Sequence, residues 1–146
     1  MATQTMALAL DVDQELAIDA PPERVFESLL HILSDGMTTP DGDSMDMRLE
    51  ARPGGRWWRD LGGDNGHFWG HVQVIKRPGL LEIVGPMFMS YAALSHIQFR
   101  VVREGGATTL SLRHQAIGAV QPEHAEGVTT GWRHMMEGVR SHAEGQ

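Results

Sequence analysis

The stretch Ser95–Gly118, SHIQFRVVREGGATTLSLRHQAIG, decides the fold of this chain. Apolar and polar residues alternate with a period of two on both sides of Gly105-Gly106. This pattern predicts two antiparallel strands joined by a two-residue turn, in which Ile97 lies opposite His114 on an otherwise apolar face. A polar side chain on a buried face needs a hydrogen-bond partner or water. We therefore expect His114 to be either a satisfied core residue or part of an internal cavity.

The rest of the chain predicts a strand, a helix, a run of strands and a final helix. Leu8–Ile18 alternates as a strand with one buried face, and Pro21-Pro22 begins a helix, since proline is tolerated in the first turn. Further strands are expected over residues 44–51, 56–61, 67–75 and 80–84. Pro122–Ala143 is the expected last helix. Its apolar stripe consists of Val128, Trp132, Met135, Met136 and Val139. Together these elements predict an α+β fold, a curved antiparallel sheet of about seven strands wrapped around the C-terminal helix.

Three glycines interrupt the sequence of this last helix. Gly127, Gly131 and Gly138 each lower its intrinsic helicity by about 1 kcal/mol relative to alanine. Because small residues allow close approach, we expect the helix to pack tightly against another part of the molecule at these positions.

The composition limits the classes of function. With 146 residues the chain is expected to form a single domain over residues 1–146. A net charge of −7 without a lysine or arginine cluster argues against nucleic acid and anionic membranes as partners. No apolar run reaches the roughly 20 residues of a membrane span, and no signal-peptide pattern is seen, so a cytoplasmic location is expected. The absence of cysteine excludes disulfides and thiol chemistry.

Eight histidines raise the question of a metal site. His67 and His71 are four residues apart, which on a strand is roughly 13 Å and too far for one ion. We therefore expect no metal and no cofactor. His124, His134 and His142 are expected on the surface of the last helix. No Gly-x-Ser-x-Gly motif indicates a nucleophilic serine.

Nearly the whole chain resembles the START/Bet v 1-like (SRPBCC) helix-grip superfamily, and within it the bacterial proteins related to the activator of Hsp90 ATPase. The segments that carry this resemblance are IDAPPERVF (18–26), RPGGRW (52–57), GHV (70–72), RPGLL (77–81), GATTLSLRH (106–114) and GW (131–132). Relatives usually carry a tryptophan-rich segment after the first helix, near the cavity mouth. This chain has SDGMTTP (34–40) there, so we expect a differently shaped mouth.

The resemblance implies a cavity between the concave face of the sheet and the last helix. Its lining by strand parity and helical spacing would be Met45, Met47, Leu49, Leu81, Ile83, Ile97, Phe99, Val101, Leu110, Leu112, His114, Val128, Trp132, Met135 and Val139. Such a lining suits a small apolar or aromatic ligand held by a few polar groups. The same residues could instead close completely and leave no void.

Three functions follow as alternatives. The first is binding of a small apolar or aromatic molecule in the cavity. The second is a cavity-based enzyme of cyclase or hydrolase type, with His114 as the acid or base, because an ordinary histidine titrates near neutral pH. The third is a partner-binding module resembling the Hsp90 activator. The expected partner is a small ligand, and a homodimer is a further option.

Overall fold

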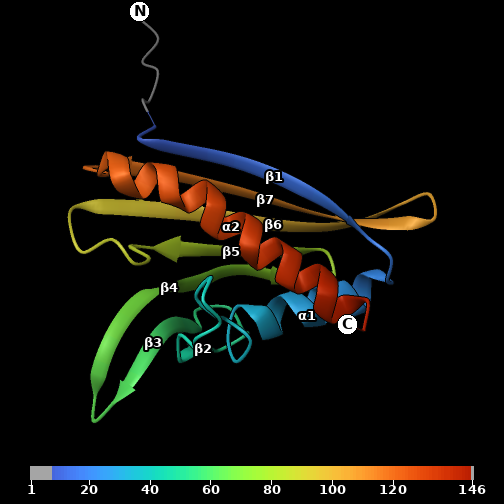
Figure 1. Cartoon of the computed structure of the whole chain (residues 1–146), viewed down its shortest axis with the longest axis horizontal. Helices are drawn as coiled ribbons and strands as arrows, with labels where there is room; N and C mark the ends of the chain where they lie inside the picture. The colour runs from blue at the N-terminus through green and yellow to red at the C-terminus, as the bar shows by residue number, and fades with distance from the viewer. Residues whose placement is uncertain (1–7, 146) are drawn as a thin grey trace, which may run out of the picture.

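The computed structural model describes residues 8–145, which form one antiparallel seven-stranded sheet and two helices (Figure 1). The elements are β1 (Leu10–Ile18), α1 (Pro22–Ile32), β2 (Met47–Leu49), β3 (Arg56–Gly62), β4 (Asn65–Lys76), β5 (Leu80–Gly85), β6 (Ala93–Glu104), β7 (Ala107–Gly118) and α2 (Pro122–Ala143). The strand order is β1-β7-β6-β5-β4-β3-β2, and α2 runs across the curved sheet. The predicted helix-grip fold is confirmed.

The central hairpin has the predicted register. Val101 pairs with Leu110, and Ile97 pairs with His114. Because side chains alternate between the two faces of a strand, this register places His114 among the apolar residues that face α2. It is fully buried there.

Two predicted strands are shorter than expected. β1 begins at Leu10 rather than Leu8, whose side chain is exposed. The strand expected over residues 44–51 contains only the three residues of β2. Asp46 adopts a left-handed backbone conformation with a φ of 53°, which a strand cannot accommodate, and so the alternation before Met47 does not continue as a strand.

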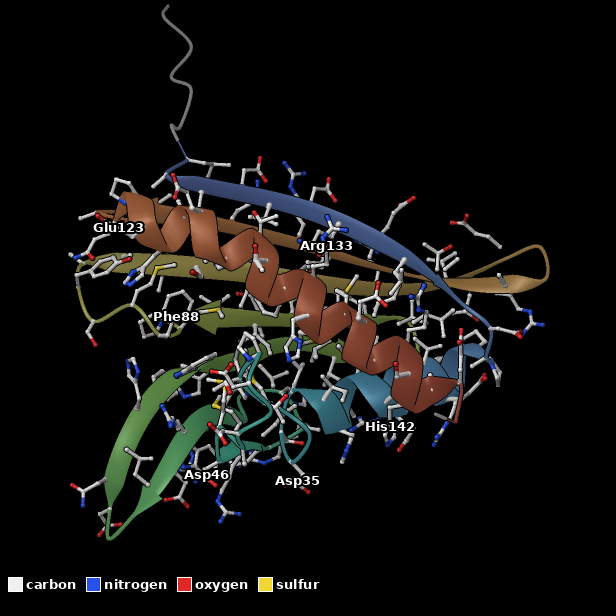
Figure 2. The ribbon with its side chains drawn as sticks, viewed as in Figure 1. Asp35, Asp46, Phe88, Glu123, Arg133 and His142 are labelled. Carbon is white, nitrogen blue, oxygen red and sulfur yellow. The ribbon has the colours of Figure 1, made fainter. Side chains whose placement is uncertain are left out.

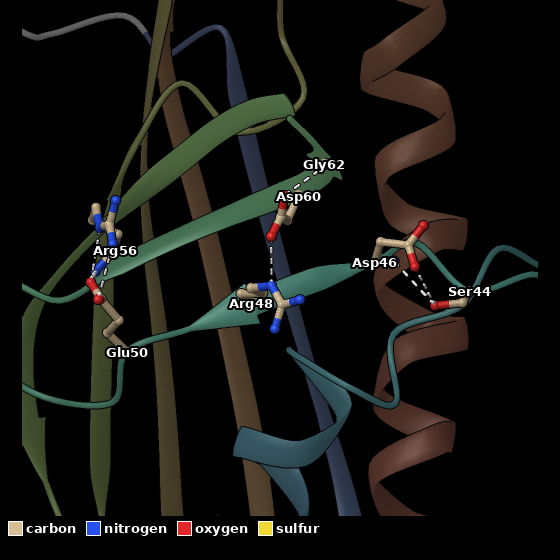
Figure 3. Close-up of polar contacts among 7 residues, drawn as sticks. All are labelled: Ser44, Asp46, Arg48, Glu50, Arg56, Asp60 and Gly62. Atoms are coloured by element: carbon tan, nitrogen blue, oxygen red, sulfur yellow. Dashed lines mark hydrogen bonds and ion pairs between the residues drawn. The ribbon is translucent and has the colours of Figure 1, made fainter. Parts of the chain in front are cut away.

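Exposed ion pairs hold the short β2 region against β3 (Figure 3). Arg48 Nε lies 2.8 Å from Asp60 Oδ2. Arg56 donates from Nε and Nη2 to the two carboxylate oxygens of Glu50, at 3.0 and 3.1 Å. These hydrogen bonds from Arg56 are the main reason that the pKa of Glu50 falls to about 2.

The core lies between α2 and the sheet, and α1 closes one end of it. The predicted apolar stripe of α2 is buried, and Trp132 is 5% exposed. Trp57 donates its indole N–H to the carbonyl of Leu33 at 2.7 Å, which ties β3 to the end of α1. Figure 2 shows Glu123 at the N-terminal end of α2 and His142 near its C-terminal end. Neither helix in residues 8–145 is long and apolar enough to cross a membrane.

Candidate functional site

A half-open pocket of about 430 Å³ lies between α2, strand β4 and two loops. The α1–β2 loop and the residues beside it contribute Ile32, Gly36, Met37, Thr38, Thr39, Pro40 and Met45. Strand β4 and the β5–β6 loop contribute Trp69, Met87 and Phe88. Helix α2 contributes Glu123, His124, Gly127, Val128, Gly131, Trp132, His134, Met135 and Gly138.

Seven of the nineteen residues in the wall are methionine, tryptophan or phenylalanine. Met37, Met45, Met87 and Met135 all line the pocket, out of nine methionines in the chain. Methionine is flexible and polarizable, so such a wall can adapt to ligands of different shape. Ligand sites are typically apolar in this way, with a few polar groups that set the orientation.

The glycines of α2 expose helix backbone to the pocket. A Cβ atom added at Gly127 or Gly131 would meet no atom within 4 Å. The prediction of close packing is therefore wrong at these two positions, because the space beside them is open pocket. At Gly138 the nearest atom to an added Cβ would be a methyl group of Ile32, at 3.6 Å, which is ordinary van der Waals contact.

A series of aromatic rings follows one side of the pocket. The ring centroids of Trp69 and Phe88 are 5.9 Å apart, and those of Phe88 and His124 are 5.3 Å apart. His124 Nδ1 lies 2.6 Å from the hydroxyl of Tyr91, which fixes the imidazole ring. Figure 2 shows Phe88 beside the end of β5, on the side of the molecule where α2 begins.

Of the three histidines predicted on the surface of α2, His134 is exposed, whereas His124 and His142 are half-buried. His124 and His134 line the pocket. His134 Nε2 lies 3.3 Å from Thr38 Oγ1, a contact that links the α1–β2 loop to α2. His142 lies instead between the two helices, where its Nδ1 is 2.8 Å from Ser28 Oγ and its ring stacks on His31.

Only part of the predicted cavity lining is in the pocket wall. Of the predicted residues, Met45, Val128, Trp132 and Met135 line it. The other predicted residues lie in the core or pack against it, outside the pocket wall. They are Met47, Leu49, Leu81, Ile83, Ile97, Phe99, Val101, Leu110, Leu112, His114 and Val139. The prediction differs here because Trp132 of α2 packs on Phe99 of β6 and on His114 of β7, where parity alone indicated a cavity.

His114 is bonded on both sides of its ring. Trp132 Nε1–H donates to His114 Nδ1 at 2.9 Å, so Nδ1 is unprotonated and Nε2 carries the proton. Nε2 lies 2.8 Å from the hydroxyl oxygen of Ser95, which accepts the hydrogen bond. Burial lowers the pKa of His114 to about 4, and the side chain does not line the pocket. The geometry fits the satisfied core residue, with side chains as its partners.

Trp132 links the buried hydrogen bond to His114 with the pocket. Its indole is held by His114 and lies edge-on to Phe99, at a centroid distance of 5.8 Å. The same side chain is part of the pocket wall. His114 therefore sets the position of a wall residue without touching the open space itself.

The pocket has little charge. Among the described residues that line it, Glu123 is the one carboxylate, and none is lysine or arginine. In residues 8–145 no three histidine or carboxylate side chains lie close enough to hold a metal ion together.

The predicted lining left out most of the residues that come from loops, although the resemblance placed residues 34–40 near the cavity mouth. No alternation along a strand indicates the side-chain direction of Thr38, Thr39 and Pro40, because they lie in a loop. The same is true of Met87 and Phe88. Two further signals in the sequence pointed to parts of the wall: the apolar cluster at residues 87–89, and the glycines repeated along one face of the last helix.

Comparisons with known proteins agree with this fold. Protein MLL2253 from Mesorhizobium loti has 16% sequence identity and a TM-score of 0.71, covering 90% of this chain and 95% of that one. Ara h 8.0201 has 8% identity and a TM-score of 0.67, with 93% and 98% covered. The Aha1 dimer from Colwellia psychrerythraea has 15% identity and a TM-score of 0.65, with 92% and 96% covered.

These identities are low, so the solved structures establish the fold and nothing more. No curated protein matches the sequence. A family model, described as Activator of Hsp90 ATPase homolog 1-like protein, matches residues 19–144, which is most of the chain. The chain therefore belongs to the Activator of Hsp90 ATPase homolog 1-like family.

Proposed function

We propose that this protein binds a small apolar or aromatic molecule in the pocket beside α2. The observation that carries the proposal is the pocket itself, about 430 Å³ in volume, with a mostly apolar wall that includes four methionines, two tryptophans and a phenylalanine. Pockets of this size and lining are typical of small-molecule sites. A core closed by its own side chains would have favoured a partner-binding module.

The position of His114 supports binding over acid–base catalysis. A general acid or base must come within hydrogen-bond reach of the substrate atom that it protonates or deprotonates. Both nitrogens of His114 are occupied by Trp132 and Ser95, and the ring lies outside the pocket wall. His114 is better suited to hold Trp132 than to exchange protons with a ligand.

The dye Nile red, which is uncharged and aromatic, provides a direct test. Binding in the pocket is expected to raise its fluorescence in a saturable manner. Gly131→Leu should abolish most of this increase, since the new side chain occupies open pocket. Thr130→Leu is the matched control, because Thr130 is exposed on the same helix and lies outside the wall.

Two results would contradict the proposal. One is the absence of saturable Nile red binding by the folded protein. The other is equal binding by both variants, which would mean that the dye occupies another surface. If the dye binds in the pocket, mass spectrometry of small molecules that co-purify with the native protein would identify the natural ligand.

A further inference from the structure

We propose that the ligand is a flat aromatic molecule without negative charge, which lies along the glycine face of α2 and accepts a hydrogen bond from the indole of Trp69. The glycine face is defined here as Gly127 and Gly131. This inference rests on the proposed function, because it names the ligand class for the same pocket.

The glycine face favours a flat molecule. No atom lies within 4 Å of where a Cβ would stand at Gly127 or Gly131, and both residues line the pocket. The two positions are four residues apart and so lie above one another on the same side of the helix. A planar ring can approach the helix backbone there more closely than a puckered saturated ring of similar size.

The rings across the wall favour an aromatic molecule. Trp69, Phe88 and His124 lie in sequence, with centroid distances of 5.9 and 5.3 Å. Aromatic rings prefer offset or edge-to-face partners at centroid distances of about 4.5–7 Å. An aromatic ring of a ligand in the pocket could therefore pack against these side chains in the same offset or edge-to-face way.

The charges at the pocket oppose an anion. Glu123 lines it, and among the described lining residues there is no lysine or arginine to pair with a carboxylate. The chain as a whole carries a net charge of −7. Moving an unpaired anion out of water into such a site is costly, whereas an uncharged ring is not penalised in this way.

The indole of Trp69 favours a ligand with a hydrogen-bond acceptor. Trp69 lines the pocket and is 4% exposed, and its Nε1–H has no hydrogen-bond partner among the described residues. A buried donor without a partner is destabilising, so an acceptor that reaches it gains affinity. Met87 lies in the same wall, and methionine side chains are flexible enough to adapt to a ligand.

Four probes of similar size separate these properties, each measured by displacement of Nile red at pH 8. They are ethylnaphthalene, its methyl ketone analogue acetonaphthone, the anion naphthoate, and the saturated bicycle decalin. Acetonaphthone should bind about two- to tenfold more tightly than ethylnaphthalene, as expected for one additional hydrogen bond. Naphthoate and decalin should both bind more weakly than ethylnaphthalene.

Trp69→Phe tests the hydrogen bond. This variant keeps an aromatic ring and removes the indole N–H, so the ketone should lose its advantage over ethylnaphthalene. The ratio of the two affinities is the readout, because a general change in the pocket affects both probes. In the unmodified protein, the indole N–H resonance of Trp69 should shift with acetonaphthone and much less with ethylnaphthalene, and this measurement does not require the variant to fold.

The inference is overturned if decalin or naphthoate binds as tightly as ethylnaphthalene, or if the ketone has no advantage and leaves the Trp69 resonance unchanged. Failure of the proposed function is a different result, in which neither Nile red nor any of the four probes binds.

Discussion

The space between α2 and the sheet has a closed region and an open one. Over β5, β6 and β7 it is closed, and Leu81, Ile97 and Leu112 there are at most 1% exposed. Beside β4 and the α1–β2 loop it is open, and the pocket lies there. Both regions are mainly apolar, so hydrophobicity alone does not decide which one closes. The difference lies in what α2 presents to each region.

Trp132 and the glycine face show how one helix produces both regions. In the closed region the indole of Trp132 fills the space and reaches His114. In the open region Gly127 and Gly131 present no side chain at all. Substitutions that remove a side chain from the closed region, or add one to the open region, therefore test whether the two regions differ in this way.

The largest effect is expected from Trp132→Ala. Trp132 is 5% exposed, contacts Phe99 edge-on and bonds to His114, so its removal leaves a cavity and an unpaired histidine. The free energy of unfolding, measured with guanidinium chloride, should fall by about 3–5 kcal/mol. A loss below about 1 kcal/mol would mean that the closed region does not depend on this side chain.

The second-largest effect is a pH dependence of the free energy of unfolding, caused by His114 in the closed region. Burial lowers the pKa of His114 from 6.5 to about 4, so between these values the unfolded chain binds a proton that the folded chain does not. The stabilising contribution is complete above pH 6.5 and is lost as the pH falls to about 4. It amounts to about 3 kcal/mol by linkage.

Urea unfolding at several pH values measures this dependence, with His114→Gln as the control. Glutamine keeps a hydrogen-bonding group and does not titrate, so the slope of stability against pH should be smaller in the variant over this range. Equal slopes in the two proteins would show that His114 titrates normally and is not sealed in the core.

A smaller effect of opposite sign is expected from Gly131→Ala in the open region. The added methyl group meets no atom within 4 Å, and alanine has a higher helix propensity than glycine. The free energy of unfolding should therefore rise by about 1 kcal/mol. A decrease would show that the backbone of α2 is tightly packed at this position, and that the space beside it is not open.

Which residues face inward in the closed region could be predicted from the sequence, whereas its closure and most of the open region could not. Alternation in Ser95–Gly118 gave the hairpin register and the inward direction of His114, because side-chain parity is a local property of strands. The pocket depends on loops such as residues 36–45, in which no periodicity indicates direction. It also depends on how far the side chains of α2 reach, which is a property of tertiary packing.

The most direct test of the pocket is a titration of the folded protein with ethylnaphthalene, followed by NMR of methionine methyl groups. We expect shifts for Met37, Met45, Met87 and Met135, which line the pocket. Met47, Met89 and Met136 are buried in the core outside the wall and should change little. Shifts in the second group without the first, or no saturable shifts in either, would contradict a binding site beside α2.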